Sequence, residues 1–217
     1  RMMKLVAPVI KAAKNYHNKM QFQARFVYTK YYDTLSIDDN AVLVESFNGD
    51  DMNGSPFYIL KELCENERYQ HLKKYVTVHN GSRKRITALL EAQIENYEDI
   101  VYVTKHSDEY CRLLASAKYL VTNVTFPTYF IKKDGQLYLN TWHGTPLKGL
   151  GRMMTDKPNT IGNVQRNLLM SDYIVCPSQF VCDVFKRDYM IDIFYQGDYV
   201  FEGYPQNAML MEHPEID

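Results

Sequence analysis

The stretch AVLVESFNGDDMNGSPFYILKELCEN, residues 41–66, contains one complete strand, loop and helix signal. Its opening residues are apolar and mostly β-branched, which is typical of a buried strand, and Asn48-Gly49 then marks a turn. The following segment predicts a helix with Ser55 as its N-cap and Pro56 in its first turn. A strand that leads directly into a helix is the repeating unit of an α/β fold.

The same alternation continues along the rest of the chain. Strand-like runs follow at 75–80, 99–105, 118–124, 136–144 and 172–178, and helical runs lie between most of them at 85–97, 107–117, 161–170 and 178–190. Alternating strands and helices predict βαβ units and a mostly parallel sheet with helices on both faces. We therefore expect a Rossmann-like α/β fold whose functional loops lie at the carboxyl ends of the strands.

Familiar nucleotide and metal motifs are missing from the expected loops. No GxGxxG follows the first strand, and the chain contains no GxxxxGK[ST]. Dinucleotide and P-loop chemistry are therefore not expected. The run NGDDMNG resembles a calcium loop but lacks its bidentate glutamate, so a solvated turn is the better interpretation. We expect no cofactor and no metal ion.

Composition sets the broad class of protein. The chain has 217 residues, 46% of them hydrophobic, which is enough for a substantial core. Its four cysteines form no CxxC pair, and we expect reduced thiols. Neither a signal peptide nor an apolar run of about 18 residues is evident, which favours a cytoplasmic protein.

Positive charge is concentrated at the amino-terminal end. Residues 1–32 contain seven Lys or Arg and no Asp or Glu, although the net charge of the chain is −1. Apolar residues recur there at helical spacing, and Pro8 starts or kinks the helix. We interpret residues 1–39 as a basic helical arm. Its apolar stripe could lie on an anionic membrane or pack on the domain with a solvated basic face, and the sequence leaves both open.

His143 is the candidate catalytic residue. It follows the strand-like run 136–144, in the loop zone where an α/β sheet binds ligands. We expect Thr145 and Pro146 to begin a helix whose free N–H groups, with Gly144, Lys148 and Arg152, form an anion site. Imidazole is the side chain most often used as a general base near neutral pH. A lone histidine is more often a satisfied core residue, so the catalytic interpretation depends on the residues around His143.

That motif is distinctive. The strings YLNTWHGTPLKGLG, FIKKDGQL and AKYLVTNVTFPTYF resemble the signature of the CDP-glycerol glycerophosphotransferases, the teichoic acid primase and polymerase family. VLVESFNG with SPFYILKEL, DYIVCPSQFVCDVF and FEGYPQNAML resemble further elements of this family in the same order. The resemblance runs from about Ala41 to Leu210.

The resemblance implies a GT-B architecture of two Rossmann-like domains. Residues 40–205 would form the acceptor-side domain, and residues 206–217 would begin the crossover to a second domain that binds the donor. The implied reaction transfers a polyol phosphate from a CDP-polyol to the terminal hydroxyl of a lipid-linked acceptor at the cytoplasmic face of the membrane. His143 would be the base, and the chain ending at Asp217 would be inactive alone, without the family's donor site.

Two other functions stay open on the sequence. A GT-B glycosyltransferase half would use His143 in the same way but take a nucleotide sugar. A nucleic-acid or membrane binding module would use the basic arm, GSRKR at 81–85 and the eighteen tyrosines. The net charge of −1 argues against nucleic acid, because phosphate binding needs a net basic face. Glycerol and ribitol, and priming and polymerisation, are not distinguished.

Overall fold

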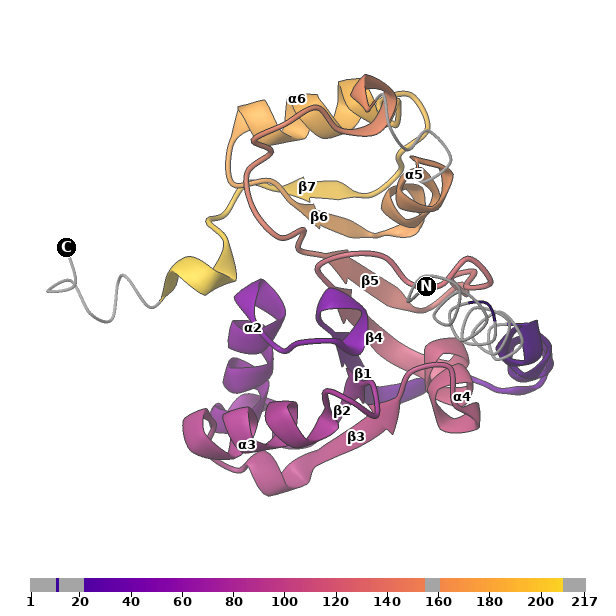
Figure 1. Ribbon diagram of the computed structural model, residues 1–217, viewed down its shortest axis with the longest axis vertical. Coiled ribbons are helices and arrows are strands. Elements are labelled where there is room, and N and C mark those ends of the chain that lie inside the picture. Colours follow the sequence, from indigo (N-terminus) through magenta and orange to yellow (C-terminus); the bar gives the residue numbers. More distant parts are fainter. Residues whose placement is uncertain (1–10, 12–21, 155–160, 209–217) are drawn as a thin grey trace, which may run out of the picture.

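A computed structural model describes Lys11 and residues 22–154 and 161–208 of the chain. Their strands form one parallel sheet in the order β3-β2-β1-β4-β5-β6-β7 (Figure 1). The strands are β1 (Asp38–Glu45), β2 (Lys73–Val78), β3 (Ile100–Thr104), β4 (Ala117–Thr122), β5 (Leu137–Asn140), β6 (Tyr173–Val175) and β7 (Asp198–Val200). The Rossmann-like prediction is confirmed. Only β7 was not predicted, because three residues at a sheet edge carry almost no periodic signal.

Helices cover both faces of this sheet, as predicted (Figure 1). The helices within the described residues include α2 (Gly54–Glu65), α3 (Arg83–Gln93), α4 (Asp108–Ser116), α5 (Ile161–Met170) and α6 (Gln179–Asp188), with 3₁₀ turns η1 (Phe47–Gly49), η2 (Glu67–Tyr69), η3 (Tyr97–Asp99), η4 (Gly151–Met153) and η6 (Pro205–Asn207). The expected helix 85–97 was wrong at its end, since α3 stops at Gln93 and Asn96 is left-handed (φ 59°). The N-cap of α2 is Asn53, not Ser55.

Alternation along β1 builds two cores. Val42 and Val44 pack under α2 and α3 on one face, whereas Ala41 and Leu43 pack under α4 on the other. Successive side chains of a strand point to opposite faces, and both faces of a parallel sheet are normally covered. A third core joins α5 and α6 to β6 and includes Trp142. The sheet is therefore rigid where the loops leave it.

The described part of the amino-terminal arm belongs partly to the domain core. Residues 22–34 are helical, and Ala24 and Tyr28 lie buried against α4. The Tyr28 hydroxyl donates a hydrogen bond to the Ile131 carbonyl at 2.6 Å. Burial raises the pKa of Tyr28 above its usual range. One face of this helix is therefore buried by packing on the domain. The rest of the predicted arm, residues 1–10 and 12–21, lies outside the described residues.

Candidate functional site

Polar residues are buried where β1, β4 and β5 end. Ser46, Asn123 and Asn140 are each fully inaccessible to solvent. Buried polar groups are costly unless they are hydrogen-bonded, so a cluster of them implies a network. These three strands are adjacent in the sheet, and their carboxyl ends therefore lie at one edge.

A tight turn after β5 presents His143 at this edge. The Asn140 side chain accepts a hydrogen bond from the Trp142 backbone N–H at 3.0 Å, and Trp142 has a left-handed backbone (φ 52°). The Trp142 ring is buried edge-on against Phe185. His143 stacks on that ring, with centroids 4.5 Å apart and planes inclined by 24°. A non-glycine residue at positive φ is uncommon and costs energy, so the surrounding contacts hold the turn in place.

The hydrogen bond of the imidazole fixes its neutral tautomer. Nδ1 of His143 lies 2.9 Å from the backbone carbonyl oxygen of Asn123. A carbonyl oxygen can only accept, so Nδ1 carries the proton and donates it. In the neutral ring Nε2 then has a lone pair, which is the form a general base requires.

The residue that orients His143 is itself held by β1. The Asn123 side-chain oxygen accepts from the Phe47 N–H at 2.9 Å, and its amide donates to Ser46 Oγ at 3.3 Å. Ser46 Oγ in turn donates to the Asn53 carbonyl at 3.0 Å. Phe47 lies beside the imidazole, with ring centroids 6.0 Å apart. The network therefore links the loop after β1 to the base after β5.

These residues enclose a cleft of about 450 Å³. Its lining comes from four parts of the chain: Phe47, Asn53, Gly54, Tyr58, Asn123, His143, Gln206 and Asn207. Sequence analysis identified only His143 among them. A usable signal was present for Asn123, a polar residue directly after a buried strand, but Gln206 and Asn207 reach the cleft only through the tertiary fold.

The helix expected at Thr145 does not exist. Residues 143–150 are irregular, and the next regular turn is η4 at Gly151. The reason is a close approach: a Cβ on Gly151 would lie 2.0 Å from the carbonyl oxygen of Asp188. Gly144 (φ 146°) and Gly151 (φ 51°) also adopt backbone conformations that helices do not use. The segment after β5 therefore crosses to the end of α6 and packs there at Gly151 before α5 begins.

The predicted anion-site residues are consequently spread along this connection. Thr145 lies near Tyr204. Burial raises the pKa of Tyr204 to about 12, and the interaction with the Thr145 side chain acts in the opposite direction. Lys148 is exposed. Arg187, and more weakly Arg152, lowers the pKa of the Asp188 carboxyl. Gly144 remains next to the base, but no helix start joins the four residues.

A helix start does face the cleft, from another element. Asn53 and Gly54, the cap and first residue of α2, both line it. The first N–H groups of a helix have no intrahelical partners and lie at the positive end of its dipole. The cleft thus combines a base with a positive helix end, supplied by the loop after β1 rather than by the loop after β5.

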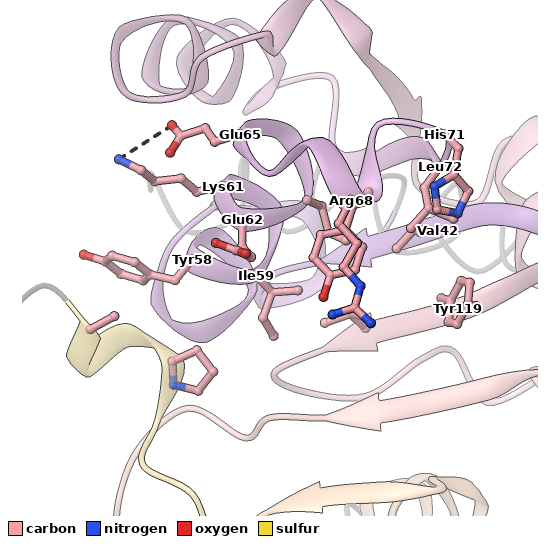
Figure 2. A pocket seen from close by; sticks show the side chains of 15 residues that line it. Val42, Tyr58, Ile59, Lys61, Glu62, Glu65, Arg68, His71, Leu72 and Tyr119 are labelled. Carbon is pink, nitrogen blue, oxygen red and sulfur yellow. Dashed lines mark ion pairs between the residues drawn. The ribbon is translucent and has the colours of Figure 1, made fainter.

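A larger hollow than the His143 cleft lies elsewhere. It measures about 720 Å³ and is bounded by α2, η2 and the sheet strands β1 and β4 (Figure 2). Mostly apolar side chains line it, and the Lys61–Glu65 ion pair, at 3.7 Å, lies at its edge. Tyr58 separates it from the His143 cleft, because it lines both. His71 is the only imidazole that the described residues contribute to this hollow.

The described residues show neither a metal-binding cluster nor a membrane-spanning helix. They contain no group of three or more His, Cys, Asp and Glu side chains that could hold a metal ion. Among them, too, no helix has the length and apolar character needed to cross a membrane.

The fold and this cleft together define a Rossmann-like domain with an oriented histidine at the carboxyl edge of its sheet. The CDP-Glycerol:Poly(glycerophosphate) glycerophosphotransferase family matches residues 27–216, and the chain belongs to this family. It is 27% identical over 192 residues to a teichoic acid poly(glycerol phosphate) polymerase of Staphylococcus epidermidis, covering 83% of this chain and 24% of that protein. It is also 27% identical over 185 residues to a teichoic acid glycerol-phosphate transferase of Staphylococcus aureus, covering 79% and 42%.

A solved structure has the same fold. The wall teichoic acid polymerase TagF superposes with a TM-score of 0.71 at 23% identity, covering 93% of this chain and 47% of that one. The chain therefore spans between about a quarter and a half of the length of these relatives.

Proposed function

We propose that the protein transfers a polyol phosphate, glycerol phosphate or ribitol phosphate, from a CDP-polyol to the terminal hydroxyl of a lipid-linked acceptor. The observation that carries the proposal is the Nδ1–H bond from His143 to the Asn123 carbonyl, which leaves Nε2 as a proton acceptor at the cleft. Membership of the glycerophosphotransferase family supports this donor over a nucleotide sugar, the other transferase considered.

The reaction follows from this arrangement. Nε2 of His143 takes the proton of the acceptor hydroxyl, and the hydroxyl oxygen attacks the polyol-bearing phosphorus of the donor. The bond between that phosphorus and the oxygen bridging to the CMP phosphate breaks, and CMP leaves with the electron pair. Phosphoryl transfer depends mainly on positioning and charge stabilisation. The amino terminus of α2 stabilises the negative charge that develops on the phosphoryl oxygens.

Residues 40–205 act as the acceptor-side half of a GT-B architecture in this proposal, and residues 206–217 begin the crossover. The donor nucleotide is then bound mainly by a second domain. The greater length of the relatives supports this division, as does the lack of a glycine-rich phosphate loop after β1. We propose that Gly144, Thr145, Lys148 and Arg152, which lie along the connection after β5, contact phosphates of the acceptor.

The test is a transfer assay on the whole protein with CDP-glycerol and a lipid-linked acceptor. We expect His143→Gln to lower kcat by about 100-fold to 10,000-fold, as loss of a general base does. The matched control is His71→Gln, in the apolar hollow, which should leave kcat unchanged. Lys148→Ala should raise KM for the acceptor about threefold at low salt, because exposed charges contribute little, whereas the exposed Lys84→Ala should not. A folded His143→Gln protein with wild-type kcat would refute the base assignment.

We propose further that the amino-terminal arm, residues 1–39, holds the enzyme at the cytoplasmic face of the membrane. Phe22 and Phe26, one helical turn apart, are 60% and 63% exposed, and Arg25 and Lys30 lie beside them. An apolar pair flanked by basic residues suits an anionic lipid surface.

Sedimentation with phosphatidylglycerol vesicles tests this role. Changing Phe22 and Phe26 together to Ser should reduce the bound fraction severalfold, and added salt should reduce it for the wild type as well. Phe201→Ser, which changes a phenylalanine that is 53% exposed elsewhere, is the control. Equal binding of the double variant and the wild type would show that the helix serves only to pack on the domain.

A further inference from the structure

A second, smaller pocket lies beside the His143 cleft and has no part in the proposed chemistry. We call it the Lys105 pocket; it measures about 190 Å³, and its lining includes Asn48, Lys105, Thr125, Pro127, Thr128 and Asn163. Pockets for drug-sized ligands measure about 300–1,000 Å³, so this one suits a single small group.

The two hollows share their dividing wall. Phe47 lines the cleft and the next residue, Asn48, lines the Lys105 pocket. Asn123 lines the cleft and Thr125, two residues on, lines the pocket. Two residues span at most about 7 Å. A ligand with repeating units could therefore occupy both.

The wall is also conformationally unusual. Phe47 (φ 44°), Asn48 (φ 61°) and His106 (φ 64°) all have left-handed backbones at the ends of β1 and β3. Such conformations are unfavourable for non-glycine residues and concentrate at functional sites.

A buried ion pair forms the floor of the pocket. Nζ of Lys105 donates to Glu45 Oε1 at 2.6 Å, with the two side chains 6% and 0% exposed, and to Asn48 Oδ1 at 3.1 Å. Tyr110, fully buried, donates its hydroxyl to the other Glu45 oxygen at 2.9 Å. An ammonium group has three donors, so one remains for the pocket that Lys105 lines.

The other polar groups of the pocket are arranged so that acceptors are occupied and donors remain. The Thr125 oxygen accepts from the Asn163 amide at 3.2 Å, which leaves the Thr125 O–H to donate. The Pro127 carbonyl and the Asn163 side-chain oxygen both accept from Arg166, at 2.9 and 2.8 Å. Thr128 adds a second hydroxyl to the lining. A ligand rich in acceptor oxygens fits this pattern.

The local charge balance selects an anion. Glu45 offsets Lys105, but no carboxylate among the described residues pairs with Arg166, which holds the loop Pro127–Phe130 behind the pocket. Burial lowers the pKa of the Arg166 guanidinium, in keeping with a charge that lacks a counter-ion. Arg166 remains cationic, since guanidinium is effectively always protonated in proteins. Arg166 thus adds, behind the pocket, a positive charge without a carboxylate partner, and this charge favours an anionic ligand such as a phosphodiester.

We propose that the Lys105 pocket is a subsite for the phosphodiester of the acceptor chain, the one that precedes the terminal polyol whose hydroxyl faces His143. The identity of the acceptor rests on the proposed function. The binding of a phosphodiester rests only on the donors, charge and size of the pocket.

The experiment titrates glycerophosphoglycerol, a phosphodiester between two glycerols, into the whole protein by calorimetry. Thr125→Val keeps the side-chain shape, and the Asn163 amide retains the Phe126 carbonyl as a partner. A hydrogen bond to a charged group is worth enough to raise Kd about tenfold or more when it is lost. We expect that increase for Thr125→Val, a larger one for Lys105→Gln, and none for Thr34→Val, an exposed helical threonine.

Lys105→Gln leaves Glu45 buried without its partner, so Thr125→Val is the decisive variant. In the transfer assay Thr125→Val should raise KM for the acceptor and leave kcat nearly unchanged. His143→Gln changes only the contact with the terminal hydroxyl, so it should weaken diester binding less than Thr125→Val does. If transfer requires His143 but folded Thr125→Val binds the diester normally, the subsite is wrong. If transfer survives His143→Gln while Thr125→Val still weakens binding, the subsite stands and the base assignment fails.

Discussion

Two connections meet at His143 and are built in opposite ways. The loop after β1, residues 46–53, is cross-linked by buried hydrogen bonds to Asn123 and leads at once into α2. The loop after β5 forms no helix across residues 143–150, and five of these residues are exposed, among them Lys148 and Leu147, which is 97% exposed. One side of the cleft is therefore fixed by polar contacts, and the other by the turn at Trp142 and the glycine contact at Gly151.

The difference teaches that similar local signals need not give similar structures. Both connections contain a turn residue followed by Ser or Thr and then Pro, the pattern expected at the start of a helix. After β1 the segment with this pattern lies over the sheet, where the apolar face of a helix can be buried. After β5 the chain must first reach the end of α6, because Gly151 packs directly on the Asp188 carbonyl.

The largest expected effect comes from breaking that glycine contact. Gly151→Ala places a Cβ 2.0 Å from the Asp188 carbonyl oxygen, at a φ of 51°, and backbone atoms cannot easily move away. We expect a loss of about 3 kcal/mol or more in the free energy of unfolding, measured with urea. Gly162→Ala in α5 is the control, since no atom lies within 4 Å of the new Cβ, and it should be neutral or stabilising by up to about 1 kcal/mol. If the two variants are equally stable, the contact of Gly151 with the Asp188 carbonyl does not explain why no helix forms after β5.

A smaller effect is expected from the hydrogen-bonded side. Ser46→Ala removes the acceptor used by the Asn53 N–H and the Asn123 amide, both near 3.3 Å, and the donor to the Asn53 carbonyl. Leaving buried groups unpaired costs about 1–3 kcal/mol in the free energy of unfolding. Ser55→Ala is a matched control, because the Ser55 hydroxyl is equally buried but has no hydrogen-bond partner. Urea denaturation curves that coincide for the two serine variants would contradict the proposed role of the network.

Much of the fold was predictable because burial leaves a periodic mark. The apolar run of β1 and the helical runs of α4 and α6 were predicted close to where the structure has them. In the structure Ser107 and Ser178 cap these two helices by accepting hydrogen bonds from the Tyr110 and Val181 backbone N–H groups. The position of His143 after a strand was equally visible. Its partners were not, since Asn123 precedes it by twenty residues and Gln206 follows it by more than sixty.

The sequence alone therefore determined the order of strands and helices, the parallel sheet and the histidine at its carboxyl edge, because each depends on local pattern and on the direction of neighbouring strands. The tertiary structure decided the rest. It selected the tautomer of His143 through the Asn123 carbonyl, replaced the expected helix after β5 by an extended crossing, and paired Lys105 with Glu45 between non-adjacent strand ends. Each of these results depends on which atoms, distant from one another in the sequence, come into contact in the fold, and no local pattern in the chain records those contacts.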